Sequence, residues 1–96
     1  MITVCMATYN GEKYIEEQLE SVLMQLHSND EVIISDDGSG DSTVDLIRTF
    51  NDPRIRLLVG NNFFSPIQNF ENALKYAKGD YIFLCDQDDV WLPDKV

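Results

Sequence analysis

The chain has 96 residues, which is enough for one domain with a modest core. Hydrophobic residues make up 44% of the sequence and aromatic residues 10%, so a folded globular chain is expected and intrinsic disorder is not. Seventeen acidic and seven basic residues give a formal net charge of −10. A field of this sign would repel nucleic acid and anionic membrane surfaces, so neither is an expected partner. Phosphates are expected to bind only through a bridging metal ion.

Four short apolar runs are predicted to form the strands of a sheet. Each run is rich in β-branched or aromatic residues and is apolar at consecutive positions, as is typical of strands covered on both faces. The runs span residues 2–6, 31–35, 55–59 and 81–85. Buried strands of this kind predict a parallel sheet.

The first segment with helical periodicity lies between the first two runs. Residues 12–26 place an apolar stripe on one face, with glutamates outside it. A second helix is expected to begin at Ser42, whose hydroxyl would cap the helix in a capping box with Asp45.

The third helix is expected to begin at Ser65-Pro66. Its inner stripe would contain Ile67, Phe70, Leu74 and Ala77, and Gly79 would end it in a left-handed conformation. The resulting β-α-β-α-β-α-β order predicts an α/β fold of the doubly wound, Rossmann-like class, with four mostly parallel strands and three helices in a single domain, residues 1–96.

The two cysteines, Cys5 and Cys85, lie inside apolar runs and are expected to be free, buried residues. Neither a disulfide framework nor a zinc site is indicated. The sequence shows no signal peptide and no apolar span of about 18 residues, which favours the cytoplasm. Membrane association through another part of a longer protein remains compatible with this expectation.

Polar or glycine-containing loops follow all four predicted strands. Ligands of open α/β sheets bind outside the carboxyl ends of the strands, so these loops define the expected site. They span residues 7–11, 36–41, 60–62 and 86–89. Taken singly, the loops also have structural explanations: Tyr9 could pack against the first helix, Asn10 could be its N-cap, and Asp36-Asp37 could belong to an ordinary turn. Carboxylates after both the second and the fourth strand favour a shared site.

The densest acidic cluster is formed by Asp86, Asp88 and Asp89, directly after the fourth run. Carboxylates this close raise one another's pKa values unless a cation lies among them. A divalent metal with oxygen ligands is the functional interpretation, and a solvated acidic loop is the alternative. No glycine-rich phosphate loop of the dinucleotide-binding or P-loop type is present. A nucleotide would therefore bind through carboxylates that accept hydrogen bonds from base and ribose, with its diphosphate on the metal.

Four motifs in this order resemble the N-terminal, nucleotide-sugar-binding half of the family 2 glycosyltransferases, which have the GT-A fold. The motifs lie at residues 6–11, 35–41, 78–82 and 86–95, so the resemblance covers nearly the whole chain. It implies that Thr8 and Tyr9 line the nucleotide pocket and that the pair Asp36 and Asp37 recognises the base, with Asp37 the better candidate.

The resemblance also implies a metal site in Asp86-Gln87-Asp88. Asp88 would be the main ligand of Mn²⁺ or Mg²⁺, and Asp86 would lie near the ribose or the metal. The donor would be a UDP- or dTDP-sugar and the acceptor a saccharide or lipid-linked hydroxyl, with inversion at the sugar, in bacterial surface-polysaccharide synthesis.

Members of this family run to a few hundred residues, and their acceptor site and catalytic base come from the later part. We therefore expect this chain to be the donor-binding part of a longer enzyme, to bind nucleotide weakly and to turn nothing over alone. Apolar side chains near the fourth strand, at Tyr81, Phe83, Trp91 and Leu92, are expected to promote self-association.

Two other functions remain open at this point. Residues 86–90 also read as the D-x-D-x-V of a haloacid-dehalogenase-like, Mg²⁺-dependent phosphatase with Asp86 as nucleophile, although that motif belongs on the first strand of its domain. A receiver-like or nucleotide-sensing module would also use an acidic edge. Such a receiver needs an aspartate at the end of its third strand, where this chain has Gly60-Asn61.

Overall fold

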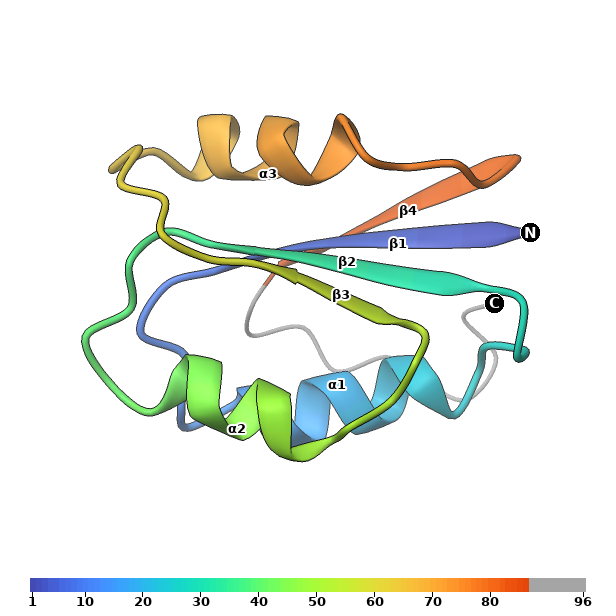
Figure 1. The fold of residues 1–96 in the computed structure, drawn as a ribbon, viewed down its shortest axis with the longest axis horizontal. Helices are drawn as coiled ribbons and strands as arrows, with labels where there is room; N and C mark the ends of the chain where they lie inside the picture. The colour runs from blue at the N-terminus through green and yellow to red at the C-terminus, as the bar shows by residue number, and fades with distance from the viewer. Residues whose placement is uncertain (87–96) are drawn as a thin grey trace.

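The computed structural model describes residues 1–86 of the chain (Figure 1). Strands and helices alternate along it as the sequence predicts. The elements are β1 (Ile2–Thr8), α1 (Ile15–Leu23), β2 (Glu31–Asp36), α2 (Thr43–Thr49), β3 (Ile55–Leu58), α3 (Pro66–Leu74) and β4 (Tyr81–Asp86).

The four strands form one sheet in the order β3-β2-β1-β4, and every neighbouring pair is parallel. Helices α1 and α2 cover one face of this sheet, and α3 covers the other (Figure 1). The predicted parallel α/β sheet is therefore confirmed. Within residues 1–86, no helix has the length and apolar content needed to cross a bilayer.

The larger part of the core lies between the sheet and helices α1 and α2. Ile15, Leu19 and Val22 on α1 are fully buried there, as the helical stripe predicts. A smaller cluster on the α3 face contains Cys5 and Ala73. Both cysteines are buried and free, and burial, with a lesser contribution from the nearby charge of Glu31, raises the pKa of the Cys5 thiol to about 11.

The predicted cap of α2 is wrong, because the hydroxyl of Ser42 makes no capping hydrogen bond. The backbone of Ser42 has φ −85° and ψ 11°, which differs from the extended conformation that lets a cap side chain reach forward. Asp41 takes this role one residue earlier, since its Oδ1 accepts a hydrogen bond from Thr43 N at 3.0 Å.

The cap of α3 is confirmed, whereas its predicted inner stripe is partly wrong. Ser65 Oγ accepts a hydrogen bond from Gln68 N at 3.3 Å. However, Ile67 is 72% exposed and Leu74 is 38% exposed, and the side chain buried in the middle of the helix is that of Asn69. The reason is that α3 crosses the sheet where β1 and β2 offer polar groups.

Gly79 does not have the left-handed conformation predicted for it. A Cβ atom at this position would lie 2.6 Å from both the backbone nitrogen and the Oγ1 of Thr3. Gly79 N also donates a hydrogen bond to Thr3 Oγ1 at 2.8 Å. Close approach of two backbone segments, and not a positive φ, therefore requires glycine here.

Strand β4 lies at one edge of the described sheet and exposes several apolar side chains. Tyr81, Ile82 and Leu84 belong to this group. Trp91 and Leu92, which were expected to join them, lie outside the described residues. Self-association through this surface stays a prediction.

Candidate functional site: the carboxyl edge of the sheet

The loops that follow β1, β2 and β3 all leave the sheet at one end, on the left of Figure 1. We call this end the carboxyl edge and the opposite end the amino edge. The register of the parallel strands pairs Thr8 with Asp36 and Ala7 with Asp86. The backbone therefore places Thr8, Asp36 and Asp86, three predicted site residues, at the same edge.

Asp36 is buried in a set of short hydrogen bonds. Its Oδ1 accepts from Thr8 Oγ1 at 2.7 Å and from Ser39 Oγ at 2.6 Å, and its Oδ2 accepts from Ser39 N at 2.8 Å. Thr8 itself is 1% exposed. These hydrogen bonds connect the end of β1 to the turn after β2. The carboxylate of Asp36 therefore holds Thr8 and Ser39 in place relative to each other.

Asp37 is also buried, and its carboxylate fastens the loop between β3 and α3. Oδ1 accepts from Phe63 N at 2.6 Å, and Oδ2 accepts from Ser65 N at 3.1 Å. The Asp37 amide donates to Thr8 O at 3.0 Å. A carboxylate has about four acceptor positions, so Asp37 can accept a further hydrogen bond without releasing the loop.

A network of amide side chains lies under the same edge, on the α3 face. Ser35 Oγ donates to Asn69 Oδ1 at 2.6 Å, and Asn69 Nδ2 donates to Thr8 O at 3.2 Å. Asn61 Nδ2 donates to Asp36 O at 3.1 Å. Asn61 belongs to the third loop of the predicted site, whereas Asn69 is not among the predicted site residues. Asn69 lies outside the stripe predicted to face the sheet, so the periodicity of the helix gave no signal for it.

Tyr9 and Asn10 form the exposed rim of the edge. Tyr9 is 50% exposed, so burial against the first helix does not account for its ring. Asn10 has φ 49°, and its Oδ1 accepts from Gly40 N at 2.8 Å. Helix α1 begins at Ile15, five residues later, so Asn10 is not its N-cap but a link to the turn after β2.

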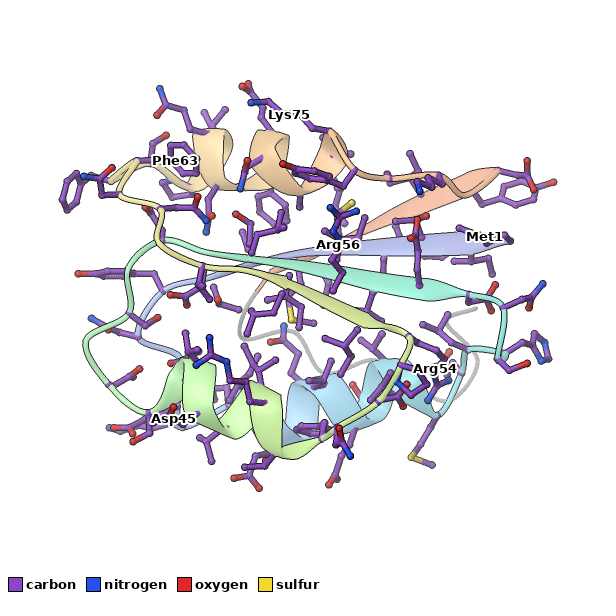
Figure 2. The ribbon with its side chains drawn as sticks, in the orientation of Figure 1. Met1, Asp45, Arg54, Arg56, Phe63 and Lys75 are labelled. Carbon is purple, nitrogen blue, oxygen red and sulfur yellow. The ribbon has the colours of Figure 1, made fainter. Side chains whose placement is uncertain are left out.

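The carboxylates at this edge have no side-chain cation beside them within the part of the chain that the structure describes. The ion pairs in that part join Met1 N to Asp80 and Arg54 to Asp52. Figure 2 shows Met1 and Arg54 at the amino edge, far from Phe63 at the carboxyl edge. Among the described residues, the donors to Asp36 and Asp37 are therefore hydroxyl and amide groups.

The predicted metal ligand Asp88, with Asp89, lies outside the described residues. Asp86 ends β4 at the carboxyl edge, which fits the predicted position for its backbone. Among residues 1–86 there is no group of three His, Cys, Asp or Glu side chains that could hold a metal ion.

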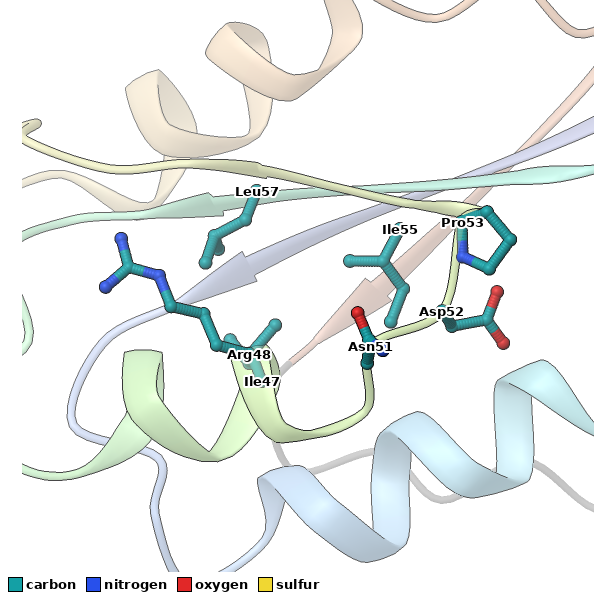
Figure 3. A pocket seen from close by; sticks show the side chains of 7 residues that line it. All are labelled: Ile47, Arg48, Asn51, Asp52, Pro53, Ile55 and Leu57. Atoms are coloured by element: carbon teal, nitrogen blue, oxygen red, sulfur yellow. The ribbon is translucent and has the colours of Figure 1, made fainter.

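A separate hollow of about 280 Å³ lies between α2 and β3, away from the predicted site residues (Figure 3). Apolar side chains form most of its wall, with Arg48 and Asn51 among its polar members. Its lining comes from the carboxyl end of α2, the segment that follows it and β3, and none of the candidate nucleotide-binding residues contributes.

Comparison with known proteins gives matches over nearly the whole chain. The sequence profile of Glycosyl transferase family 2 matches residues 3–96. A UDP-Glc:alpha-D-GlcNAc-diphosphoundecaprenol beta-1,3-glucosyltransferase of Escherichia coli is 35% identical over 96 residues, which are 100% of this chain and 38% of that protein. A dTDP-rhamnosyl transferase of Shigella flexneri is 40% identical over 98 residues, covering 95% of this chain and 34% of that protein.

Two solved structures share the fold. S. aureus TarS in complex with UDP matches with a TM-score of 0.82 and 32% identity, over 91% of this chain and 27% of that chain. A mannosyltransferase from Pyrobaculum calidifontis, in complex with GDP-Man and Mn²⁺, matches with a TM-score of 0.86 and 28% identity, over 97% and 29%.

The chain thus spans little more than a third of the length of these curated relatives. The family match extends over nearly all residues of this chain, so the phosphatase and receiver alternatives are rejected. With its parallel sheet and these similarities, the chain belongs to glycosyltransferase family 2 and has the GT-A fold.

Proposed function

We propose that this chain is the donor-binding part of a metal-dependent, inverting glycosyltransferase. The donor would be a UDP- or dTDP-sugar, and the acceptor a saccharide or lipid-linked hydroxyl in bacterial polysaccharide assembly. The names of the relatives support this choice, because they include a glucosyltransferase using UDP-Glc and a dTDP-rhamnosyl transferase. TarS has been solved with UDP and with UDP-GlcNAc.

The observation that carries the proposal is the pair of buried carboxylates at the carboxyl edge. Asp36 is the last residue of β2, the second strand from the sheet edge, and Asp37 follows it; among the described residues only neutral donors reach them. A nucleobase N–H and ribose hydroxyls are neutral donors too, so they add hydrogen bonds without a competing ion pair. The exposed ring of Tyr9 beside them offers a flat surface for a base.

Asp37, Asp36 and Thr8 have different roles in this proposal. Asp37 would accept a hydrogen bond from the base through a lone pair that its two backbone partners leave open. Asp36 would keep the turn after β2 and the hydroxyl of Thr8 in place. Thr8 would contribute to the pocket through its position, because its hydroxyl and carbonyl groups already have partners.

Asp88 and Asp86 would hold the metal, Mn²⁺ or Mg²⁺. Carboxylate oxygens are the donors that these hard cations prefer, and β4 delivers Asp86 to the edge where Thr8 and Asp36 lie. The bound ion would offset the charge that develops on the diphosphate leaving group. An acceptor hydroxyl would displace this group from the sugar C1 in a single step, which inverts the configuration.

The catalytic base would come from beyond the donor-binding part, as the family resemblance implies. We therefore expect this chain by itself to bind donor nucleotide weakly and to transfer no sugar. Glycosyl transfer by residues 1–96 alone would contradict this expectation.

Calorimetric titration with UDP and with dTDP, each with and without Mn²⁺, tests the proposal. Binding should require the metal or be strengthened by it, and Asp88→Asn should remove that dependence. The matched control is Asp45→Asn, which removes one carboxylate from the exposed surface of α2 and should leave binding unchanged. Absence of binding to either nucleotide in the presence of Mn²⁺ would overturn the proposal.

A further inference from the structure

Phe64 combines two unfavourable features in the loop between β3 and α3. Its backbone has φ 53°, a left-handed conformation that a bulky residue rarely adopts, and its side chain is 84% exposed. Burial of an aromatic ring stabilises a folded protein, yet neither hydrophobic cluster of the described residues includes Phe64. Such a combination is a reason to look for a function.

The loop around Phe64 is held firmly on both sides. The Asp37 carboxylate accepts the amides of Phe63 and Ser65, the residues immediately before and after Phe64. Ser65 then caps α3 through its hydroxyl. The side chain that is the leading candidate for contacting the base therefore holds the residues on both sides of Phe64.

The order of the strands places Phe64 and Tyr9 on opposite sides of Asp37. Asp37 follows β2, which lies between β1 and β3 in the sheet. Tyr9 follows β1, and the loop that carries Phe64 follows β3. The loop also packs against the turn after β2, because a Cβ atom at Gly38 would lie 3.1 Å from Asn61 O. Two exposed aromatic residues therefore flank one buried carboxylate.

We infer that Phe64 is an aromatic contact for the nucleobase of the donor. This inference rests on the proposed function and adds a residue to its binding site. The carboxylate of Asp37 would take a base N–H while the ring of Phe64 contacts the flat face of the base or its edge. Stacking of this kind depends little on which base is present, so it suits UDP and dTDP alike.

The substitution Phe64→Gly separates a binding role from a structural one. Glycine adopts a positive φ without strain, so the unfolding midpoint should stay the same or rise. Affinity for UDP in the presence of Mn²⁺ should fall about tenfold, the usual scale for loss of one aromatic stacking partner. Phe64→Trp keeps a flat aromatic surface and should retain most of the affinity.

Ile67→Ala is the matched control. Ile67 is a second exposed apolar residue close in sequence, but it lies on regular helix in α3. Its removal should change the affinity for UDP less than twofold.

The outcomes distinguish this inference from the proposed function. If the unaltered protein binds UDP and Phe64→Gly binds it equally well, the inference is wrong and the proposed function stands. If Phe64→Gly is destabilised and Phe64→Trp does not retain affinity, the role is structural and the inference is again wrong. If the unaltered protein binds neither UDP nor dTDP, the proposed function fails and takes the inference with it.

Discussion

The two ends of the sheet both bury carboxylates, but they balance the charge differently. At the amino edge, Asp52 Oδ2 lies 2.7 Å from Arg54 Nη2, and Arg54 Nη1 donates to Leu23 O and Leu26 O at 3.1 Å each. One guanidinium thereby pairs with an acid and satisfies carbonyls at the end of α1. At the carboxyl edge, Asp36 and Asp37 have only hydroxyl and amide donors within residues 1–86. Among the described residues, the amino edge therefore pairs a carboxylate with a side-chain cation, whereas the carboxylates of the carboxyl edge accept hydrogen bonds from neutral groups and keep acceptor positions for a ligand.

The carboxylates of the amino edge also illustrate how hydrogen bonds fix a charge state. The side-chain hydrogen bond from Arg54 is the main cause of the lowered pKa of Asp52. Burial alone would raise the pKa of Asp30, but hydrogen bonds from the amides of His27 and Ile2 hold it below its ordinary value. Asp30 and Asp52 therefore stabilise the fold when they are ionised.

The largest expected effect on stability concerns the amino edge. Gly79→Ala places a methyl group 2.6 Å from the backbone of Thr3, so the loop before β4 must move. We expect a loss of about 2–3 kcal/mol in the free energy of unfolding, measured with urea. Gly40→Ala at the carboxyl edge is the control, because a Cβ atom there meets no atom within 4 Å, and it should change stability little. Equal effects at the two glycines would contradict the packing described for Gly79.

A somewhat smaller effect is expected under the carboxyl edge. Asn69→Ala leaves Ser35 Oγ without its acceptor and removes one of the donors to Thr8 O. We expect a loss of about 2 kcal/mol, because these groups remain buried. Asn72→Ala removes only a part-buried donor to Ser35 Oγ and should cost less, about 0.5–1 kcal/mol. Urea unfolding of both variants gives the comparison, and a larger loss for Asn72→Ala would refute the central position of Asn69.

Acid should weaken the amino edge through Asp30. Its pKa is lower in the folded protein than in the unfolded chain, so its contribution is fully present above the unfolded value, about 3.9. The contribution is lost as the pH falls through the lower folded value. Unfolding measured from pH 6 down to pH 3 should therefore depend less on pH in Asp30→Asn than in the unaltered protein. An identical pH dependence would show that Asp30 is not stabilised in its ionised form.

The smallest expected effect compares two helix caps. Ser65→Ala removes a hydrogen bond to Gln68 N and should cost about 0.5–1 kcal/mol. Ser42→Ala should cost almost nothing, since Ser42 makes no capping hydrogen bond. Thermal unfolding of the two variants tests the pair, and a cost at Ser42 equal to that at Ser65 would restore the cap predicted from the sequence.

Most of the fold could be predicted from the sequence because apolar runs and helical periodicity are local signals. Strands β1 to β4 and the buried face of α1 follow from them directly. The inner face of α3 could not be predicted in this way. Asn69 is buried because Ser35 and Thr8 lie beneath it, and that depends on the order of the strands.

The candidate site, like the fold, could be predicted from the sequence only in part. Its location at one edge of a parallel sheet, with Asp36 and Asp37 after β2, was predictable from the alternation of elements. The hydrogen bonds from the amides of Phe63 and Ser65 to the Asp37 carboxylate could not be predicted, because these residues are 26 and 28 positions away in the sequence. Predicting contacts over such a sequence separation requires knowledge of which loops lie side by side. The place of Phe64 beside Asp37 follows only from these contacts.

The most direct test of the central claim is a map of backbone amide signals during titration with UDP and Mn²⁺, recorded by NMR. We expect the largest shifts at the carboxyl edge, in Tyr9, Gly38, Ser39 and Phe64, with little change at Asp30 and Arg54 on the amino edge. Shifts confined to the amino edge, or to the hollow between α2 and β3, would contradict the account.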